Sequence, residues 1–329
     1  MPRTLAADST MKEATVTLSV VLVNYNTAHL LDEVFGALEA ASEGVSLQII
    51  VVDNASRDNS LEVLRTRYPH VELIANTTNV GFGRANNQAL PLVRGRYVLL
   101  LNTDAFVSPD SLRTTLACME QHPRCGILGV RLVGRDGALQ PSCRYFPTPF
   151  NGFILVTGLT RFFPSVRMVD DMQWDHAALR ECDWVPGCYY LMRRELIEQV
   201  GLFDPRYFLY YEEVDHCFAA KRAGWQVLYC PDTTVVHIGG ESAKADDKLT
   251  AARQISTLQI ESELIFFRKH HGLPGMLTDL ALAIVADFVV AAKGLIKRFD
   301  TAGFASRFKH AGWMLALLLR TSFGRRSTR

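Results

Sequence analysis

Four short apolar runs near the start of the chain each end in polar residues, and the first three lead into segments with helical spacing. The runs lie at residues 19–23, 47–52, 71–75 and 97–101. In the segments that follow, apolar residues recur every three or four positions, as they do on one face of a helix. Continuous apolar strands that alternate with helices are typical of a parallel β-sheet covered on both faces. The pattern therefore predicts an α/β fold with a mainly parallel central sheet flanked by helices.

Polar side chains stand at the ends of three of these runs, where a parallel sheet usually binds its ligands. Asn24, Asp53 and Asp104 occupy these positions. Asparagine, aspartate and serine also cap helices, and for Asn26 and Ser108 we favour that simpler role. For Asp53 and Asp104 we favour a functional role. The carboxyl edge of the sheet is therefore the predicted binding site.

Two common nucleotide-binding motifs do not occur in the sequence. A dinucleotide-binding fold needs G-x-G-x-x-G directly after its first strand, whereas residues 24–27 read Asn-Tyr-Asn-Thr. The nearest match, Gly81-Phe82-Gly83, follows the third run and lacks the third glycine. The phosphate-binding motif G-x-x-x-x-G-K-[ST] is missing as well. NAD chemistry is therefore disfavoured.

Several motifs occur in order over residues 18–242. They read VVLVNYN from residue 20, IIVVDNASRDNS from 49, NVGFGRANN from 79, LLLNTDAFV from 99, WVPGCYYLMRRELIEQVGLFDPRYFLYYEEVDHCFAAKRAGW from 184 and HIGGES from 237, with a weaker match in FFRKHHG from 266. Together they resemble the motifs of the family 2 glycosyltransferases, in particular those of bacterial rhamnosyltransferase-like members. The resemblance implies the GT-A fold, which binds nucleotide sugars.

This resemblance also suggests how the chain is organised. It implies a GT-A domain over residues 17–242, preceded by a flexible N-terminus (1–16) and followed by a helical C-terminal extension (243–329). The implied activity is inverting transfer of a sugar from a nucleotide donor to a hydroxyl group. The favoured donor is dTDP-rhamnose, and the favoured acceptor is a lipid-linked or cell-surface glycan. A UDP-sugar donor stays open, as do a non-catalytic nucleotide-sugar-binding protein and a nucleotidyltransferase.

The resemblance assigns donor binding to the strand ends and to the turn after the third run. Asp53 resembles the residue that accepts a hydrogen bond from the imide N–H of uracil or thymine, a donor that cytosine lacks. Asn24 and Asn26 are expected to hold the ribose or the base, and Asn79 matches a further pocket position. Arg84 is expected to reach the diphosphate or the sugar, unless it is an ordinary exposed helix arginine.

The departing diphosphate gathers negative charge, which a divalent cation stabilises as a Lewis acid. Asp104 stands where the family has the second aspartate of Asp-x-Asp, whereas Asn102 replaces the first and is expected to face the donor. One carboxylate holds Mn²⁺ or Mg²⁺ weakly, so the diphosphate is expected to supply further oxygens. In the family a histidine at the position of His237 can complete the metal shell, which favours Mn²⁺. The alternative is a histidine that only hydrogen-bonds backbone at a strand end.

Three acids within residues 211–215 are candidates for the base that removes the proton of the acceptor hydroxyl. A positioned carboxylate base accelerates such a step by about 10² to 10⁴. The Glu-Asp pair of the family aligns with Glu212-Glu213, so Glu213 is the expected base and Asp215 the reserve. Glu212 is expected to orient the acceptor. Clustered acids would also suit an exposed helix start, because they stabilise its dipole.

Two other segments are expected on the acceptor side. Trp184 offers an aromatic face on which a sugar ring can stack, although a core position is the more common role for a tryptophan. Residues 139–171 contain four prolines and many aromatic residues without a clear period. We therefore expect this segment to be a mobile flap or an acceptor loop.

The charge of the chain is unevenly distributed. Lys and Arg total 35 and Asp and Glu 34, but residues 293–329 carry nine basic residues and one acid, so this tail has a charge of +8 and the rest −7. Basic residues interleaved with Trp and Phe, as in residues 304–329, are typical of a helix on an anionic membrane surface. The catalytic interpretation calls for no nucleic acid. The sequence leaves open whether the chain forms a homo-oligomer.

Residues 276–296 approach the length of a membrane span. Asp287 lies near the middle of this segment, where a charge costs about 2.5 to 3.5 kcal/mol on insertion. An interfacial or core-packed helix is therefore favoured. The seven cysteines lack C-x-x-C spacing, and residues 1–10 contain no apolar signal-peptide run. Together these features predict a cytoplasmic protein bound peripherally to the cytoplasmic face of the inner membrane.

Overall fold

The structure, a computed structural model, describes residues 16–239, 251–299 and 301–329, and only the backbone of residues 251–256 and 297–298. The flexible N-terminus predicted for residues 1–16 lies outside these residues except for residue 16. Residues 240–242, which end the HIGGES motif, also lie outside them.

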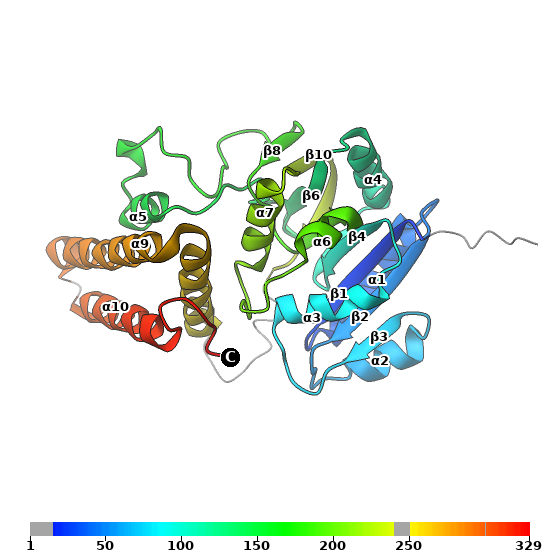
Figure 1. Cartoon of the computed structure of the whole chain (residues 1–329), viewed down its shortest axis with the longest axis horizontal. Coiled ribbons are helices and arrows are strands. Elements are labelled where there is room, and N and C mark those ends of the chain that lie inside the picture. The colour runs from blue at the N-terminus through cyan, green and yellow to red at the C-terminus, as the bar shows by residue number, and fades with distance from the viewer. Residues whose placement is uncertain (1–15, 240–250, 300) are drawn as a thin grey trace, which may run out of the picture.

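A ten-stranded mixed sheet forms the centre of residues 18–237 (Figure 1). One half is the predicted parallel array, in the order β3 (Glu72–Ala75), β2 (Leu47–Asp53), β1 (Leu18–Asn24) and β4 (Tyr97–Asn102). The other half continues with β9 (Tyr189–Arg193), β6 (Cys125–Val133), β10 (Gln226–His237) and β5 (Ala105–Val107). Two short strands pair at its margin, β7 (Leu139–Gln140) with β6 and β8 (Arg180–Cys182) with β10. Strand β9 runs antiparallel to both of its neighbours, so the sheet is mixed rather than parallel throughout.

Helices cover both faces of the sheet, as the apolar runs predict. Alternate residues of β1 point to opposite faces, so Val20 and Leu22 pack in one core and Val21 in the other. The first core is closed by α1 (Leu31–Ala41), α2 (Ser60–Arg67) and α4 (Ser111–Gln121). The second is closed by α3 (Phe82–Ala89), α6 (Arg194–Val200), α7 (Glu212–Arg222) and part of α9 (Ala251–Arg298). Short 3-10 turns extend the connections, η1 (Ala28–Leu30), η2 (Leu90–Leu92) and η3 (Thr160–Phe162). All seven cysteines are buried free thiols.

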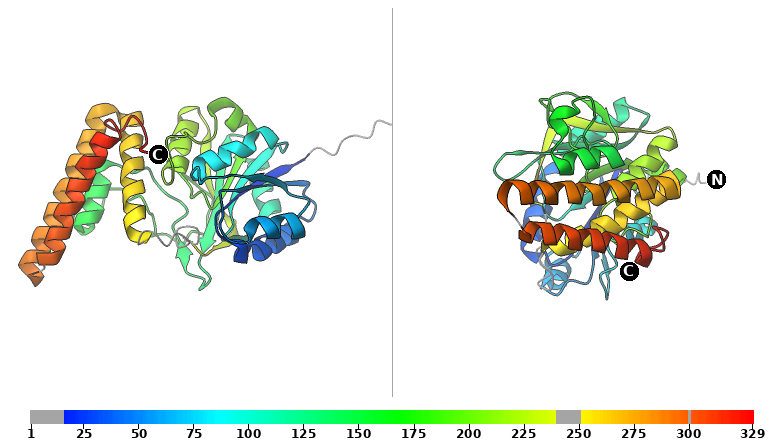
Figure 2. Two further views of the ribbon diagram at one scale, coloured as in Figure 1. Left: turned by 90° about the horizontal axis from the view of Figure 1, so that it is seen from below. Right: turned by 90° about the vertical axis from the view of Figure 1, so that its left-hand side faces the viewer.

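The C-terminal extension is built on α9, which is kinked at Gly272. Gly272 has φ 71°, a value that favours glycine, and Pro274 follows it. The helix therefore breaks at this point. The first half of α9 packs against the second core of the sheet through buried apolar side chains such as Leu264 and Phe266. The second half lies beside α10 (Thr301–Arg320) at the far end of the molecule (Figure 2).

The segment expected to be a flap contains a regular helix. Helix α5 (Pro149–Thr157) begins with a capping box, in which Thr148 and Asn151 satisfy each other's backbone N–H groups. Its last carbonyl, on Thr157, accepts a hydrogen bond from Lys293 of α9 at 2.8 Å. We call α5, the second half of α9 and α10 together the helical layer. Residues 139–171 are therefore more regular than their composition suggests, because α5 packs on a helix distant in sequence.

One helical stretch among the described residues, 257–296, is long and apolar enough to cross a membrane by length and composition, a test that core helices also pass. The kink at Gly272 divides this stretch. Asp287 is buried and accepts hydrogen bonds from Arg307 at 2.8 Å and from His310 at 2.6 Å, both on α10. The charge that argues against a membrane span is thus neutralised inside the helical layer.

Candidate active site

A chain of buried hydrogen bonds crosses the carboxyl ends of β2, β1 and β4. Asn24 Nδ2 donates to Asp53 Oδ2 at 2.7 Å, and Asn24 Oδ1 accepts from the Thr27 hydroxyl at 2.7 Å. The Thr27 hydroxyl also contacts the Thr103 hydroxyl at 2.8 Å. All four side chains are buried. Asn24 therefore holds the carboxylate of Asp53 in place, in agreement with the prediction that these residues share one edge of the sheet.

The other residues predicted to bind the nucleotide sugar differ in whether their side chains already form hydrogen bonds within the protein. Asn26 has φ 55°, and its Oδ1 accepts from the backbone N–H of Arg57 at 2.6 Å. Asn79 Oδ1 accepts from the backbone N–H of Gly81 at 2.9 Å. These two side chains support turns around the pocket. The side-chain amide of Asn102, by contrast, makes no hydrogen bond to a described residue, so it is available to a ligand.

Arg84 is engaged by the C-terminus of the chain. Its Nε donates to the carbonyl of Pro205 at 2.7 Å, and its Nη2 donates to the carbonyl of Arg329 at 3.1 Å. The guanidinium of Arg329 lies 5.3 Å from the ring centroid of Phe208. Arg84 therefore joins the last residues to the loop before α7, which leaves less of its guanidinium for the predicted diphosphate contact.

Asp104 and His237 face each other at the end of the sheet. Asp104 Oδ1 lies 3.6 Å from His237 Nε2, and His237 Nδ1 lies 2.9 Å from Gln140 Oε1. The amide nitrogen of Gln140 donates to the backbone carbonyl of His237 at 2.8 Å. Since the Gln140 nitrogen is used there, its oxygen accepts from Nδ1–H, and Nε2 carries no proton. Burial lowers the pKa of His237 and keeps the ring neutral, although the Asp104 charge opposes this effect.

This arrangement suits a divalent cation. A carboxylate oxygen and an unprotonated imidazole nitrogen that face each other repel unless a cation or a proton lies between them. An outer hydrogen bond that fixes the tautomer, as from Gln140, is usual for metal-binding histidines. No third His, Cys, Asp or Glu joins the pair to form a metal-binding group within the part of the chain that the structure describes. The pair therefore fits weakly held Mn²⁺ or Mg²⁺, with further ligands from diphosphate and water.

Two strained residues directly precede the acid pair on α7. Tyr210 and Tyr211 both have φ 71°, which residues other than glycine rarely adopt outside functional sites. Glu212 and Glu213 each have one carboxylate oxygen that is buried without a hydrogen-bond partner. Burial raises the pKa of both groups; the Glu213 charge adds to the shift at Glu212, whereas Arg144 opposes it at Glu213. Unpartnered buried carboxylates are costly, so this pair is a strong candidate for a functional site.

The acid pair and the Asp104–His237 pair lie near one thiol. The backbone N–H of Asn102 donates to the carbonyl of Cys188 at 3.1 Å, which fixes Cys188 beside the end of β4. Burial raises the pKa of the Cys188 thiol, and the charges of Asp104 and Glu213 raise it further. The charges of Asp104 and Glu213 therefore both act on the same thiol.

Asp215, the reserve base, is fully occupied by other contacts. Its Oδ2 accepts from Lys269 Nζ at 2.7 Å, and its Oδ1 accepts from His270 Nε2 at 2.6 Å and from the Tyr207 hydroxyl at 3.2 Å. Lys269 and His270 belong to the FFRKHHG motif on α9. Asp215 is thus a structural tie between α7 and α9, which leaves Glu213 as the better candidate for the base.

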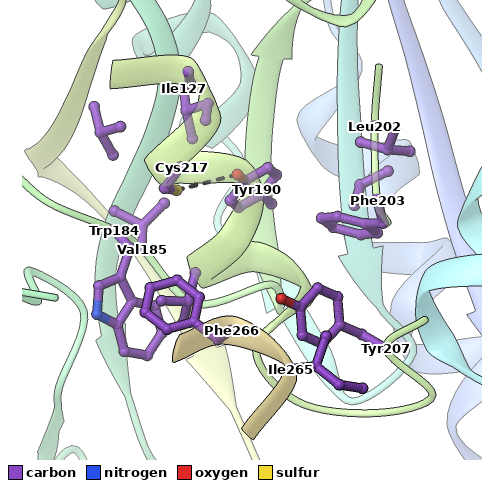
Figure 3. Close-up of a cluster of buried hydrophobic side chains, with 14 of the residues drawn as sticks. Ile127, Trp184, Val185, Tyr190, Leu202, Phe203, Tyr207, Cys217, Ile265 and Phe266 are labelled. Atoms are coloured by element: carbon purple, nitrogen blue, oxygen red, sulfur yellow. Dashed lines mark hydrogen bonds between the residues drawn. The ribbon is translucent and has the colours of Figure 1, made fainter. Parts of the chain in front are cut away.

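Trp184 is packed rather than open. Only 6 % of the residue is exposed, and its Nε1–H donates to the carbonyl of Tyr145 at 2.8 Å. The guanidinium of Arg144 lies 4.1 Å from its ring centroid, while the ring itself sits in the cluster with Val185 and Phe266 (Figure 3). The structure does not support the predicted stacking of a sugar on Trp184. Sequence reasoning missed both Gln140 and Arg144, which lie in a run without clear periodicity.

Residues 19–201 match the family model described as glycosyl transferase family 2. The chain belongs to this family. It is 30% identical over 243 residues to N-acetylglucosaminyl-diphospho-decaprenol L-rhamnosyltransferase of Mycobacterium tuberculosis, covering 70% of this chain and 78% of that protein. It is 25% identical over 229 residues to rhamnosyltransferase WbbL of Escherichia coli, covering 66% of this chain and 82% of that protein. The glycosyltransferase activity and the resemblance to rhamnosyltransferases are thereby confirmed.

A solved structure supports the fold. Mannosyltransferase PcManGT from Pyrobaculum calidifontis, in complex with GDP-Man and Mn²⁺, has a TM-score of 0.54 to this glycosyltransferase at 16% identity. The match covers 94% of this chain and 88% of that one. The predicted GT-A fold with a helical C-terminal extension is therefore confirmed.

Proposed function

We propose that this glycosyltransferase transfers rhamnose from dTDP-rhamnose, with inversion, to a hydroxyl group of a lipid-linked glycan. The observation that carries the proposal is the pair of unpartnered carboxylates on Glu212 and Glu213, close to the Asp104–His237 pair. The names of the relatives in Mycobacterium tuberculosis and Escherichia coli support the choice of rhamnose. A UDP-sugar is the alternative donor, because uracil and thymine present the same imide N–H to Asp53.

Glu213 removes the proton of the acceptor hydroxyl as that oxygen attacks the anomeric carbon. Burial raises the pKa of Glu213 above its usual value, which makes its carboxylate a stronger base than an exposed glutamate. Glu212 orients the acceptor hydroxyl from the neighbouring position. Because the base acts on the acceptor in a single displacement, the configuration of the anomeric carbon is inverted.

On the donor side, Asp53 accepts the imide N–H of the base, and Asn24 keeps its carboxylate in the required orientation. The free amide of Asn102 contacts the ribose or the diphosphate. A divalent cation held by Asp104 and His237 would act as a Lewis acid on the charge of the departing diphosphate.

The direct test is a screen of nucleotide sugars by thermal shift with and without Mn²⁺, followed by a transfer assay with the donor that binds. A ligand that binds the native state raises its apparent stability. Glu213→Gln keeps the side-chain volume but removes the base, so kcat is expected to fall by about 10² to 10⁴ while the donor still shifts the melting temperature. Asp215→Asn would instead reduce stability. Full transfer activity in Glu213→Gln would show that another group is the base.

We also propose that the enzyme lies on the cytoplasmic face of the membrane through the helical layer. Seventeen of the twenty exposed large apolar side chains among the described residues lie in residues 150–163 or 273–323, and Leu92, Met172 and Leu179 are the exceptions. These segments gather at one end of the molecule (Figure 2). An apolar face of this extent, with basic residues nearby, suits the interface of an anionic bilayer.

The basic tail takes a smaller part in this proposal than its charge suggests. Arg307 pairs with Asp287 inside the helical layer. The chain end returns to the first half of α9, where Thr328 donates to the Glu261 carboxylate through its backbone N–H and its hydroxyl, both at 2.6 Å. The exposed apolar side chains therefore become the main docking groups, and charge adds to their effect.

Flotation on vesicles of phosphatidylglycerol and phosphatidylethanolamine tests this placement. Ile296 and Phe299 are 79% and 85% exposed, so changing both to Glu leaves the core intact and should reduce flotation strongly. Leu92→Glu, at an exposed apolar site of the catalytic domain, is the matched control and should float as the wild type does. Unchanged flotation of the Ile296→Glu, Phe299→Glu double variant would contradict the placement.

A further inference from the structure

The run between β7 and α5 carries a cation that the mechanism above does not use. Arg144 lies on this run, and its backbone pairs with Trp184 through N–H···O of 3.2 Å and the reverse bond of 3.1 Å. Its side chain is 25% exposed, in contrast to the buried ring beneath it. The Arg144 side chain is therefore partly open to solvent, so a ligand can reach it.

The guanidinium of Arg144 is held in one orientation. Asp170 Oδ1 accepts its Nε–H at 2.6 Å and lies 2.5 Å from Nη2, and the ring of Trp184 supports its face at 4.1 Å. A guanidinium has five N–H donors. No other described residue accepts a hydrogen bond from the guanidinium of Arg144, so the guanidinium donors that Asp170 does not use are open to a ligand. A planar, preoriented guanidinium with open donors suits the paired oxygens of a phosphate group.

The position of Arg144 relative to the rest of the site suggests which phosphate it binds. Its partner Trp184 leads through residues 185–187 to Cys188, which lies near both Asp104 and Glu213. The charge of Arg144 is close enough to the acid pair to lower the pKa of Glu213. In the other direction along the chain, α5 of the helical layer begins five residues later, at Pro149. Along the chain, Arg144 thus lies between the helical layer and the strand ends of the active site, since its backbone pairs with Trp184 on one side and α5 follows on the other.

We propose that Arg144 binds the diphosphate that joins the acceptor sugar to its lipid. This inference rests on the proposed function, because it requires a lipid-linked acceptor. With the sugar hydroxyl at Glu213 and the lipid against the helical layer, the linking diphosphate lies between them, where Arg144 presents its donors. Asp170 is 42% exposed, so solvent screens the repulsion between its carboxylate and a bound diphosphate.

The test compares an acceptor that carries the linking diphosphate with one that lacks it. One is a sugar linked through diphosphate to a short prenyl chain, and the other is the neutral glycoside of the same sugar with an alkyl chain of equal length. The measured quantity is the ratio of their kcat/KM values, because any effect of Arg144 on the pKa of Glu213 alters both acceptors alike and cancels. Arg144→Met should lower this ratio at least about 10-fold, mainly through KM for the diphosphate acceptor. Arg144→Lys keeps the charge but not the paired N–H donors of the guanidinium, so it should give an intermediate ratio. This variant also tests the inference if Arg144→Met does not fold.

Arg96→Met is the matched control. Arg96 also pairs with a carboxylate, Glu120 at 2.6 Å, and lies over an aromatic ring, Tyr97 at 5.3 Å, but it stands at the opposite end of β4 from the active site. It should keep the wild-type ratio. Equal ratios in the wild type and both Arg144 variants would overturn the inference while leaving the proposed transfer reaction intact. Failure of the wild type to glycosylate either acceptor would instead refute the proposed function, and the inference with it.

Discussion

Two buried carboxyl groups in the extension make the stability of this glycosyltransferase depend on pH. Asp279 is only 8% exposed, and burial together with the nearby charge of Glu263 raises its pKa to about 9. Burial also raises the pKa of Glu263, although the hydrogen bond that it accepts from the Tyr211 hydroxyl at 3.1 Å opposes the shift. Asp279 is therefore buried within the extension, where the charge of Glu263 on the first half of α9 reaches it.

The sign and the size of the effect follow from proton linkage. In the unfolded chain an aspartate ionises near pH 3.9, so at pH 6 to 8 the native state binds one more proton at Asp279 than the unfolded state does. A raised pKa contributes stability that is fully present below the unfolded pKa and is lost as pH rises towards the folded one. Each pH unit in this window costs 1.36 kcal/mol per such group, so the contribution of Asp279 to the free energy of unfolding should fall by about 2.7 kcal/mol between pH 6 and pH 8.

Asp279→Asn removes this proton exchange while keeping the shape of the side chain. Urea unfolding, followed by tryptophan fluorescence at pH 6, 7 and 8, should show that the variant gains about 2.7 kcal/mol relative to the wild type over this range. Glu43→Gln, which removes a carboxylate in an exposed turn, should keep the wild-type slope. If Asp279→Asn and the wild type lose stability in parallel, Asp279 is ionised in the native state and the burial argument is wrong.

Two further predictions concern the contacts around the active site. Lys269→Met removes the lysine that donates to the buried carboxylate of Asp215 and should lower the free energy of unfolding by about 1 to 3 kcal/mol. The loss is limited because the hydrogen bond from His270 remains and Lys269 is partly exposed. An unchanged urea midpoint would show that the ion pair contributes nothing net. Gln140→Leu removes the partner that fixes the tautomer of His237, so the Mn²⁺ concentration for half-maximal activity should rise about 10-fold to 100-fold, with kcat restored at saturating Mn²⁺. Equal Mn²⁺ titration curves for Gln140→Leu and the wild type would contradict this role.

The first half of the fold is predictable because its information is local. Each apolar run forms a strand of the parallel array, and the array orders itself with β1 at its centre. Asn24, Asp53 and Asp104 then meet at one edge because the strands run in the same direction. The helix stop at Gly272 is local too, since a left-handed glycine followed closely by proline ends a helix whatever it packs against.

The features that sequence reasoning missed depend on partners far along the chain. Asp215 is a residue type that can act as a base, yet Lys269, 54 positions away, donates a hydrogen bond to its carboxylate. Trp184 is a residue type on which sugar rings often stack, yet the guanidinium of Arg144 lies over its ring. Arg84 points to the last residue of the chain, 245 positions away. None of these pairings leaves a periodic signal, because each joins two elements whose relative positions are set by the folded core.

The domain boundary predicted at residue 242 divides the sequence but not the active site. On the first half of α9, Lys269 and His270 donate hydrogen bonds to Asp215. On the same half, the Glu263 carboxylate accepts a hydrogen bond from the Tyr211 hydroxyl. Tyr211 is one of the two strained residues that aim the acid pair, and such strain persists only where surrounding contacts hold it. The helical layer continues from the same helix. If a lipid surface anchors this layer, as we propose, the same helix also supports the residues that precede the proposed base, so docking and catalytic geometry depend on one element.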